Sequence, residues 1–187
     1  MMTIEHRTLP ITEIRADATS RQIIGIAASY LTLSSDLGGF REQIAPTAFT
    51  RSLAESPNIL ALYSHNSAML LGTTRSGTLA LSSNDKGLSF DLHLPDTTYG
   101  NDVLELMRRG DLKEMSFGFW TRKDTWDTSS GEKIRTLHDV DLREISIVAD
   151  PAYPVGTQAA QRSLSSHQSR TVMERALRFL DLQNRRR

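Results

Sequence analysis

The chain has 187 residues with 22 basic and 22 acidic side chains, so its net charge is zero and no overall positive field points to a nucleic-acid partner. It contains no cysteine, which excludes disulfides, thiolate catalysis and cysteine–zinc sites. The sequence shows no signal peptide and no apolar run near the roughly 18 residues that a membrane span needs. We therefore expect a soluble intracellular protein that does not associate with membranes.

In chain order, a β-branched run at residues 21–31 predicts the first strand. Residues 46–55 predict a helix, because Pro46 stands near its start, where a missing N–H costs nothing. Four further strands follow in two pairs, and each pair flanks a polar segment, SHNSA or SSNDKG. These strands are expected at residues 59–63, 70–74, 78–82 and 88–94.

A second helix is predicted over residues 98–109, with an apolar stripe on one side, two arginines in its last turn and Gly110 as its C-terminal cap. A strand around Ser116 and another over residues 139–148 complete the body. Strand spacing of this kind predicts a mainly β protein with flanking helices, of the α+β class, built as a small closed or partly open β-barrel.

The folded body is expected to span residues 1–154, and the composition changes after it. Residues 155–170 are rich in Gln and Ser and have no apolar periodicity, which is typical of a linker. Residues 171–187 are a basic tail with a short predicted helix over 172–182. Residues 155–187 hold seven arginines against two acidic residues, a balance of +5, so the body carries −5.

The strand around Ser116 has two unlike faces. In MSFGF, Met115, Phe117 and Phe119 share one face because strand side chains alternate, which leaves Ser116 and Gly118 on the other. A serine beside a small residue leaves room for a carbonyl carbon to approach, as a nucleophile requires. From the pattern alone, a polar residue on the solvent side of a half-buried sheet is the simpler interpretation.

His65 ends an apolar strand in ALYSHNSAM and has polar neighbours, as suits a partly open general base. A surface or hydrogen-bonded histidine fits the same position. Of the other histidines, His93 lies on a polar strand face, and His6 and His167 lie near the chain ends, where order is least expected. His138 precedes a strand and stays a candidate.

Glu144 shares an apolar strand face with Leu142 and Val148 in DVDLREISIV. A carboxylate in such a place is costly unless it is paired or hydrogen-bonded, and either an imidazolium or an arginine would satisfy it. A serine, a histidine and a carboxylate are thus available on three strands. No phosphate-binding Gly-rich loop and no clustered metal ligands are visible, so we expect neither a cofactor nor a metal.

Several blocks of the sequence occur in an order that resembles a known family. Between residues 25 and 154 they are GIAASY, FREQIAPTAFTRSL, ILALYSHN, DKGLSFDLHLP, LMRRGDLKEMSFGF and VDLREISIVADPAYP. The set resembles the prohead protease family of tailed bacteriophages, which is distantly similar to the herpesvirus assemblins. One departure is Thr47, where the family usually has Gly, and it is harmless if Pro46 starts a helix.

The resemblance implies a serine endopeptidase that matures phage procapsids by cutting the scaffold portion from the major capsid protein and then cutting itself. The implied partners are the capsid protein and its scaffold segment, and a second copy of the chain is a further candidate. The implied location is the assembling procapsid in the host cytoplasm.

The family's site residues fall on three positions of this chain. The resemblance implies that Ser116 is the nucleophile and His65 the base. The third member falls on Glu144, with His138 in reserve because the herpesvirus relatives use a second histidine. Ser116 would then face a cleft, and Gly118 would let a substrate backbone approach it.

Two other functions compete with the peptidase. The chain could be a non-catalytic capsid-assembly or scaffold factor that retains the protease fold, with its tail helix docked on capsid protein. A nucleic-acid-binding barrel rests on the basic tail alone, which lacks interleaved aromatic residues, and ranks last. For a peptidase, the tail is expected to deliver the enzyme into the assembling shell.

Overall fold

A computed structural model describes residues 4–9, 14–17, 20–55, 58–129 and 131–149, together with positions 165, 167–171, 173–174 and 177–178 of the C-terminal part. The helices are α1 (Thr50–Glu55) and α2 (Thr98–Arg109). The strands are β1 (Glu5–Leu9), β2 (Ile14–Asp17), β3 (Gln22–Ser29), β4 (Arg41–Ile44), β5 (Leu60–Tyr63), β6 (Asn66–Thr73), β7 (Leu79–Ser83), β8 (Gly87–His93), β9 (Glu114–Asp127) and β10 (Ile134–Val148).

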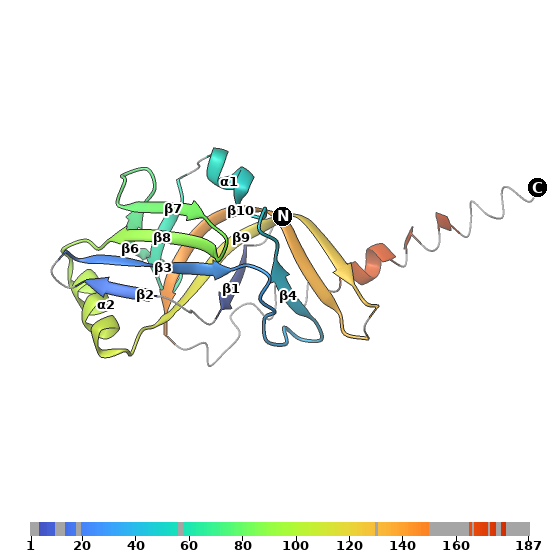
Figure 1. The fold of residues 1–187 in the computed structure, drawn as a ribbon, viewed down its shortest axis with the longest axis horizontal. Helices are drawn as coiled ribbons and strands as arrows, with labels where there is room; N and C mark the ends of the chain where they lie inside the picture. The colour runs from blue at the N-terminus through green and yellow to red at the C-terminus, as the bar shows by residue number, and fades with distance from the viewer. Residues whose placement is uncertain are drawn as a thin grey trace, which may run out of the picture.

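The strands form two sheets. The larger has the order β1-β9-β10-β5-β6, with β4 paired to β10, and the smaller has the order β2-β3-β8-β7. The long strands β9 and β10 curve through the body and continue beyond it as a hairpin (Figure 1). The prediction of a mainly β fold with few helices is confirmed. The barrel is not confirmed, because the described strands keep two separate hydrogen-bond ladders and no closed ladder forms among them.

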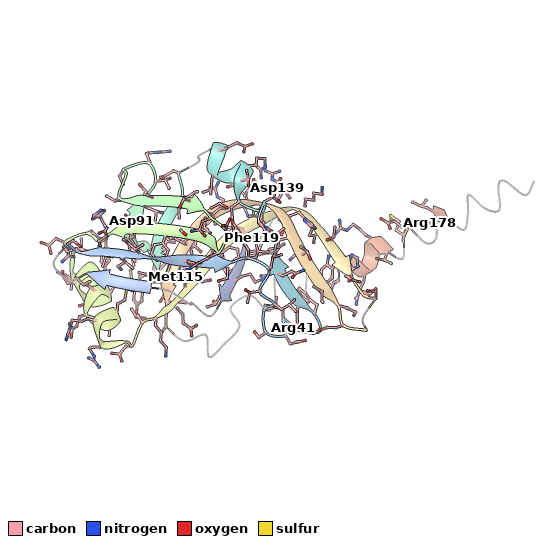
Figure 2. All side chains as sticks on the ribbon, viewed as in Figure 1. Arg41, Asp91, Met115, Phe119, Asp139 and Arg178 are labelled. Carbon is pink, nitrogen blue, oxygen red and sulfur yellow. The ribbon has the colours of Figure 1, made fainter. Side chains whose placement is uncertain are left out.

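The aromatic face of β9 forms the centre of the core. Met115, Phe117 and Phe119 are fully buried, and the rings of the two phenylalanines stack with centroids 5.1 Å apart. Phe49, just before α1, meets Phe117 edge-on at 5.6 Å. Figure 2 shows Met115 and Phe119 in the interior of the body. The alternation in MSFGF therefore predicted the buried face of this strand correctly.

Helix α2 has the predicted bounds because both of its ends are capped. The side chain of Thr97 accepts a hydrogen bond from the backbone N–H of Gly100, and Gly110 adopts the left-handed conformation with φ 81°. Helix α1 is shorter than predicted, since residues 46–49 form turns before it. Thr47 is not among the residues with positive φ, so its departure from the family's Gly causes no backbone strain.

Strands β1, β2 and β4 were not predicted. At β1 and β4 a buried ion cluster stands where apolar residues would. Arg7 Nε lies 2.7 Å from Glu42 Oε1, and Arg7 Nη2 lies 2.6 Å from Glu5 Oε2. Arg135 Nη1 lies 2.8 Å from Glu5 Oε2 and 2.9 Å from Glu42 Oε2. Paired charges with many hydrogen bonds can be buried at acceptable cost. The cluster fixes β1 to β4 and β10.

The described tail residues are helical, and they begin inside the predicted linker. Ser165 and residues 167–171 are helical, and the ring of His167 stacks on Trp126 with centroids 4.6 Å apart. Within the predicted 172–182 helix, positions 173–174 and 177–178 are helical, and the remainder lies outside the described residues. No helix of the described chain is long and apolar enough to cross a membrane.

Candidate active site

Two rows of polar residues cross one face of the larger sheet. Thr8 of β1 is paired with Ser116 of β9, which is paired in turn with Ser146 of β10. In the next row Gly118 of β9 stands between His6 of β1 and Glu144 of β10. Paired residues on one face of a sheet have Cβ atoms roughly 4.5–5.5 Å apart. Ser116 therefore lies one row away from Glu144.

His65 is held at this face by a tight turn between β5 and β6. Tyr63 and Asn66 are paired, so the turn consists of Ser64 and His65, which have φ of 52° and 59°. Positive φ at both central residues matches the twist of a two-residue hairpin, a place usually taken by Asn and Gly. Ser64 N–H donates to the carbonyl of Ile147 at 2.9 Å, and this hydrogen bond ties the turn to β10.

Glu144 accepts hydrogen bonds on both of its carboxylate oxygens. His65 Nδ1 lies 2.7 Å from Oε1, and His6 Nε2 lies 3.3 Å from the same oxygen. The Ser146 hydroxyl donates to Oε2 at 2.6 Å. Burial raises the pKa of the Glu144 carboxyl, but hydrogen bonds from His6, His65 and Ser146 lower it more, and the net pKa is about 2. The carboxylate therefore stays ionised at neutral pH.

Ser146 is hydrogen-bonded to both Glu144 and the backbone of His65, a role that the sequence analysis did not assign. Besides donating to Glu144, its oxygen accepts the backbone N–H of His65 at 3.2 Å, and the side chain is fully buried. One hydroxyl thus fixes the carboxylate and the turn that carries the imidazole. Ser146 lies two residues after Glu144 on the same face of β10, and this position was the sequence feature from which its contact with Glu144 could have been predicted.

His6 was wrongly expected to lie in a poorly ordered end of the chain. It belongs to β1 and reaches Glu144 across Gly118, and its ring centroid is 4.2 Å from that of His65. A Cβ at Gly118 would stand 2.5 Å from Glu144 Oε1 and 3.0 Å from His6 Cδ2. The missing side chain of Gly118 therefore makes room for the two histidines and the carboxylate to meet. The approach of a substrate backbone at Gly118 stays a prediction.

Ser116 does not face an open cleft as predicted. Its side chain is fully buried, and its hydroxyl donates to the backbone carbonyl of Arg7 at 3.0 Å. Strand β1, which was missing from the predicted fold, pairs directly with β9 at this position. Among the described residues, Ser116 and His65 are not hydrogen-bonded to each other.

His138, the reserve third member, lies apart from this group. It stands six residues before Glu144 on β10, or about 20 Å along an extended strand, and its Nε2 is 2.8 Å from Thr125 Oγ1. Asp139, the next residue on β10, pairs with Arg51 of α1 and is labelled beside that helix in Figure 2. Glu144 itself is contacted by His6 and His65, and no arginine among the described residues pairs with it.

The geometry suits proton transfer by His65. If its Nδ1–H donates to Glu144, its Nε2 is left as a free acceptor, and a positive charge on the ring would be stabilised by the adjacent carboxylate. The expectation of no clustered metal ligands is wrong, because one nitrogen of His6, one of His65 and a carboxylate oxygen of Glu144 lie within 4.8 Å of one another. These ligands come from distant parts of the chain, so no local sequence motif could have predicted the cluster.

Comparison with known proteins supports the family resemblance. A family model described as caudovirus prohead serine protease matches residues 8–170. Among solved structures, the capsid assembly protease of bacteriophage T4 superposes with a TM-score of 0.53 and 11% sequence identity, covering 80% of this chain and 98% of that one. A comparison with curated proteins yields no significant match.

The family match covers well over half of the chain and defines a serine peptidase class. The chain therefore belongs to the caudovirus prohead serine protease family. The likeness to the T4 protein, at 11% identity, establishes the shared fold. His6 lies before the matched residues 8–170, so its contact with Glu144 is a feature of this chain outside the family match.

Proposed function

We propose that the chain is a capsid-maturation endopeptidase in which Ser116 is the nucleophile, His65 the general base and Glu144 the residue that orients and stabilises His65. The observation that carries this proposal is the 2.7 Å contact between His65 Nδ1 and Glu144 Oε1, one row away from Ser116 on the same sheet face. It is supported by membership of a serine protease family.

In the proposed reaction, His65 Nε2 takes the proton of the Ser116 hydroxyl as its oxygen attacks the scissile carbonyl. The same nitrogen then returns the proton to the leaving amine, and Glu144 remains ionised throughout. Because Ser116 is fully buried and its hydroxyl donates to the carbonyl of Arg7, turnover requires β1 to move away from β9 and the hydroxyl to turn toward His65. In this proposal, the buried Ser116 belongs to a resting form of the enzyme.

The proposed substrates are the scaffold portion of the major capsid protein and the enzyme itself, cut inside the assembling procapsid. The family description and the capsid assembly role of the T4 protein support this choice. The C-terminal tail is proposed to bring the enzyme into the shell, and a second copy of the chain is a further proposed partner.

The proposal is tested by co-expressing the chain with the major capsid protein of the same phage and measuring intact masses. Wild type should remove a segment from the capsid protein, and Ser116→Ala should leave it whole. Ser35→Ala is the matched control, because Ser35 is exposed on the surface. Cleavage by Ser116→Ala at the wild-type rate would refute the assignment.

The second candidate is a non-catalytic assembly factor that retains the fold. The full burial of Ser116 and its hydrogen bond to Arg7 favour it, since a serine held this way is not available to a substrate. This candidate predicts that shells form equally well with wild type and with Ser116→Ala, and that the capsid protein has the same mass in both.

A further inference from the structure

Three side chains that are good ligands for a transition-metal ion meet at one point of the larger sheet. They are His6 from β1, His65 from the β5–β6 turn and Glu144 from β10, and their ligand atoms all lie within 4.8 Å of one another. We propose that this cluster is a binding site for Zn²⁺, in which the ion is held by His6 Nε2, His65 Nδ1 and a Glu144 oxygen.

The spacing of the ligand atoms is close to what a zinc ion requires. Nitrogen and oxygen ligands about 2.0–2.1 Å from a tetrahedral zinc ion are roughly 3.3 Å from each other. His6 Nε2 lies 3.3 Å from Glu144 Oε1, and His65 Nδ1 lies 2.7 Å from it. The two histidine nitrogens lie within 4.8 Å of each other, so the two imidazole rings would move closer together to hold the ion, and a water would take the fourth position.

The charge and the surroundings of the cluster also favour a metal ion. Glu144 offers a carboxylate oxygen to the ion, and its side chain is oriented by hydrogen bonds on both oxygens. The Ser146 hydroxyl fixes Oε2 of Glu144, which is the kind of outer hydrogen bond that orients metal ligands. Two imidazoles and one carboxylate suit zinc, whereas Mg²⁺ and Ca²⁺ prefer oxygen ligands.

An ion can reach the cluster from solvent. The side chain of His6 is 27% exposed and that of His65 is 15% exposed, whereas Glu144 beneath them is 7% exposed. A Cβ at position 118 would stand 2.5 Å from Glu144 Oε1, so Gly118 leaves the space in which the ligands converge.

Zinc binding would stop His65 from acting as a base, a consequence that rests on the proposed function. The neutral imidazole carries one proton, and in the proposed catalytic form that proton is on Nδ1. A zinc ion that takes the Nδ1 lone pair moves this proton to Nε2, with no net proton release. Nε2 then becomes a donor and can no longer accept the proton of the Ser116 hydroxyl, so the ion acts as a reversible inhibitor.

The test begins with binding, measured by titrating metal-free full-length protein with Zn²⁺ against a chromogenic chelator. We expect wild type to bind one equivalent and to gain thermal stability, and Mg²⁺ to do neither. His6→Gln, whose amide can still donate to Glu144, should bind zinc more than tenfold more weakly. His93→Gln is the matched control, because His93 is an exposed histidine on β8, and it should bind as wild type does.

Zinc affinity in His6→Gln equal to that of wild type, or no binding of one equivalent by wild type, would overturn the proposed site. Circular dichroism and the thermal midpoint without metal show whether His6→Gln is folded. Should it fail to fold, Glu144→Gln provides the same comparison.

A peptidase assay with and without zinc separates this inference from the proposed function. Inhibition of wild type at zinc concentrations that saturate the site supports both. Zinc binding by a protein that cleaves nothing under any condition would remove the peptidase and leave the metal site standing. Cleavage that is unaffected at saturating zinc would overturn the inhibitory role.

Discussion

At the scale of single residues, Glu144 organises the site because its two oxygens gather donors from separate parts of the chain. His6 comes from the edge strand, His65 from a hairpin turn and Ser146 from the same strand as Glu144. The carboxylate is buried, so solvent screens its interactions only weakly. Each hydrogen bond to it is of the strong, charge-assisted kind.

The pKa of Glu144 predicts a loss of stability in acid. Its carboxyl has a pKa of about 2 in the folded protein against 4.5 for the unperturbed group. A lowered folded-state pKa contributes stability above the unfolded value, and that contribution is lost as pH falls from about 4.5 toward 2. Glu144→Gln should therefore show a shallower fall in the free energy of unfolding across this window, measured by urea denaturation.

Absolute stability of the Gln variant is expected to be lower, so the comparison concerns the slope with pH. Glu132→Gln, at an exposed surface position, serves as the control and should keep the wild-type slope. The same slope in Glu144→Gln as in wild type would show that the carboxylate is not held ionised by its neighbours.

At the scale of elements, strand β1 has two functions on its two faces. Glu5 and Arg7 point to the buried ion cluster, while His6 and Thr8 belong to the face of the candidate site. The ion cluster therefore fixes the position of His6 relative to Glu144.

Arg7→Met should destabilise the fold by about 3–5 kcal/mol, because it removes one of the two arginines that neutralise the buried carboxylates of Glu5 and Glu42. Arg109→Met is the matched control, since Arg109 pairs with Asp111 in solvent, and it should change stability by about 1 kcal/mol or less. Chemical denaturation checks both values. Equal effects would mean that the cluster does not anchor β1.

The β5–β6 turn holds two non-glycine residues in a left-handed conformation, which costs roughly 1–2 kcal/mol for each. Ser64→Gly should relieve one of these, offset in part by the greater freedom of Gly in the unfolded chain, for a net gain of about 0.5–1 kcal/mol. Thermal unfolding measures the gain. Ser35→Gly is the control and should lower stability, because Ser35 has no positive φ to relieve. A lower stability of Ser64→Gly than of wild type would contradict the proposed backbone strain at Ser64.

Where the sequence carried ordinary patterns, the fold was predictable. Helix α2 has capping residues at both ends, and residues 115–119 of β9 alternate between large apolar and small side chains. The same reasoning failed at β1 and β4, whose buried faces carry Glu5, Arg7 and Glu42 instead of apolar residues. Hydrophobic periodicity cannot detect a face that is buried as an ion cluster, and the missing β1 also concealed His6.

The candidate site was predictable in part for the same reason. Glu144 was recognisable as a carboxylate that needed a partner on an apolar face, and His65 was one of the partners considered. Ser116 is covered by β1, which was not predicted. Ser146 binds the backbone of a two-residue turn, and that turn lacks the Asn-Gly pair from which its length could have been predicted. Those features arise from contacts between distant segments.

At the scale of the whole molecule, the β9–β10 hairpin packs against the described part of the tail. Trp126 on this hairpin stacks on His167 and also packs on Phe40, with centroids 4.9 Å apart. Beyond His167, Met173 and Leu177 stand at helical positions four residues apart and are exposed by 67% and 60%. Two exposed apolar side chains on one side of a helix suit a partner surface.

Replacing Met173 and Leu177 together by Gln should leave the proposed peptidase activity unchanged and reduce incorporation into proheads severalfold, because the proposed apolar contact between tail and shell would be lost. Quantitative mass spectrometry of purified proheads measures the incorporation. Glu174→Gln lies on the same helical stretch and is the control. Normal incorporation of the double variant would remove the proposed delivery role of this helix.

The central claim is that Ser116 and His65 act as one catalytic unit, and it is tested most directly by cleavage rates of the single and double alanine variants. Residues that act as a unit have non-additive effects. We expect Ser116→Ala and His65→Ala each to lower the rate by several orders of magnitude, and the double variant to be no slower than either. Losses that multiply in the double variant, or a Ser116→Ala protein that cleaves at the wild-type rate, would contradict the account.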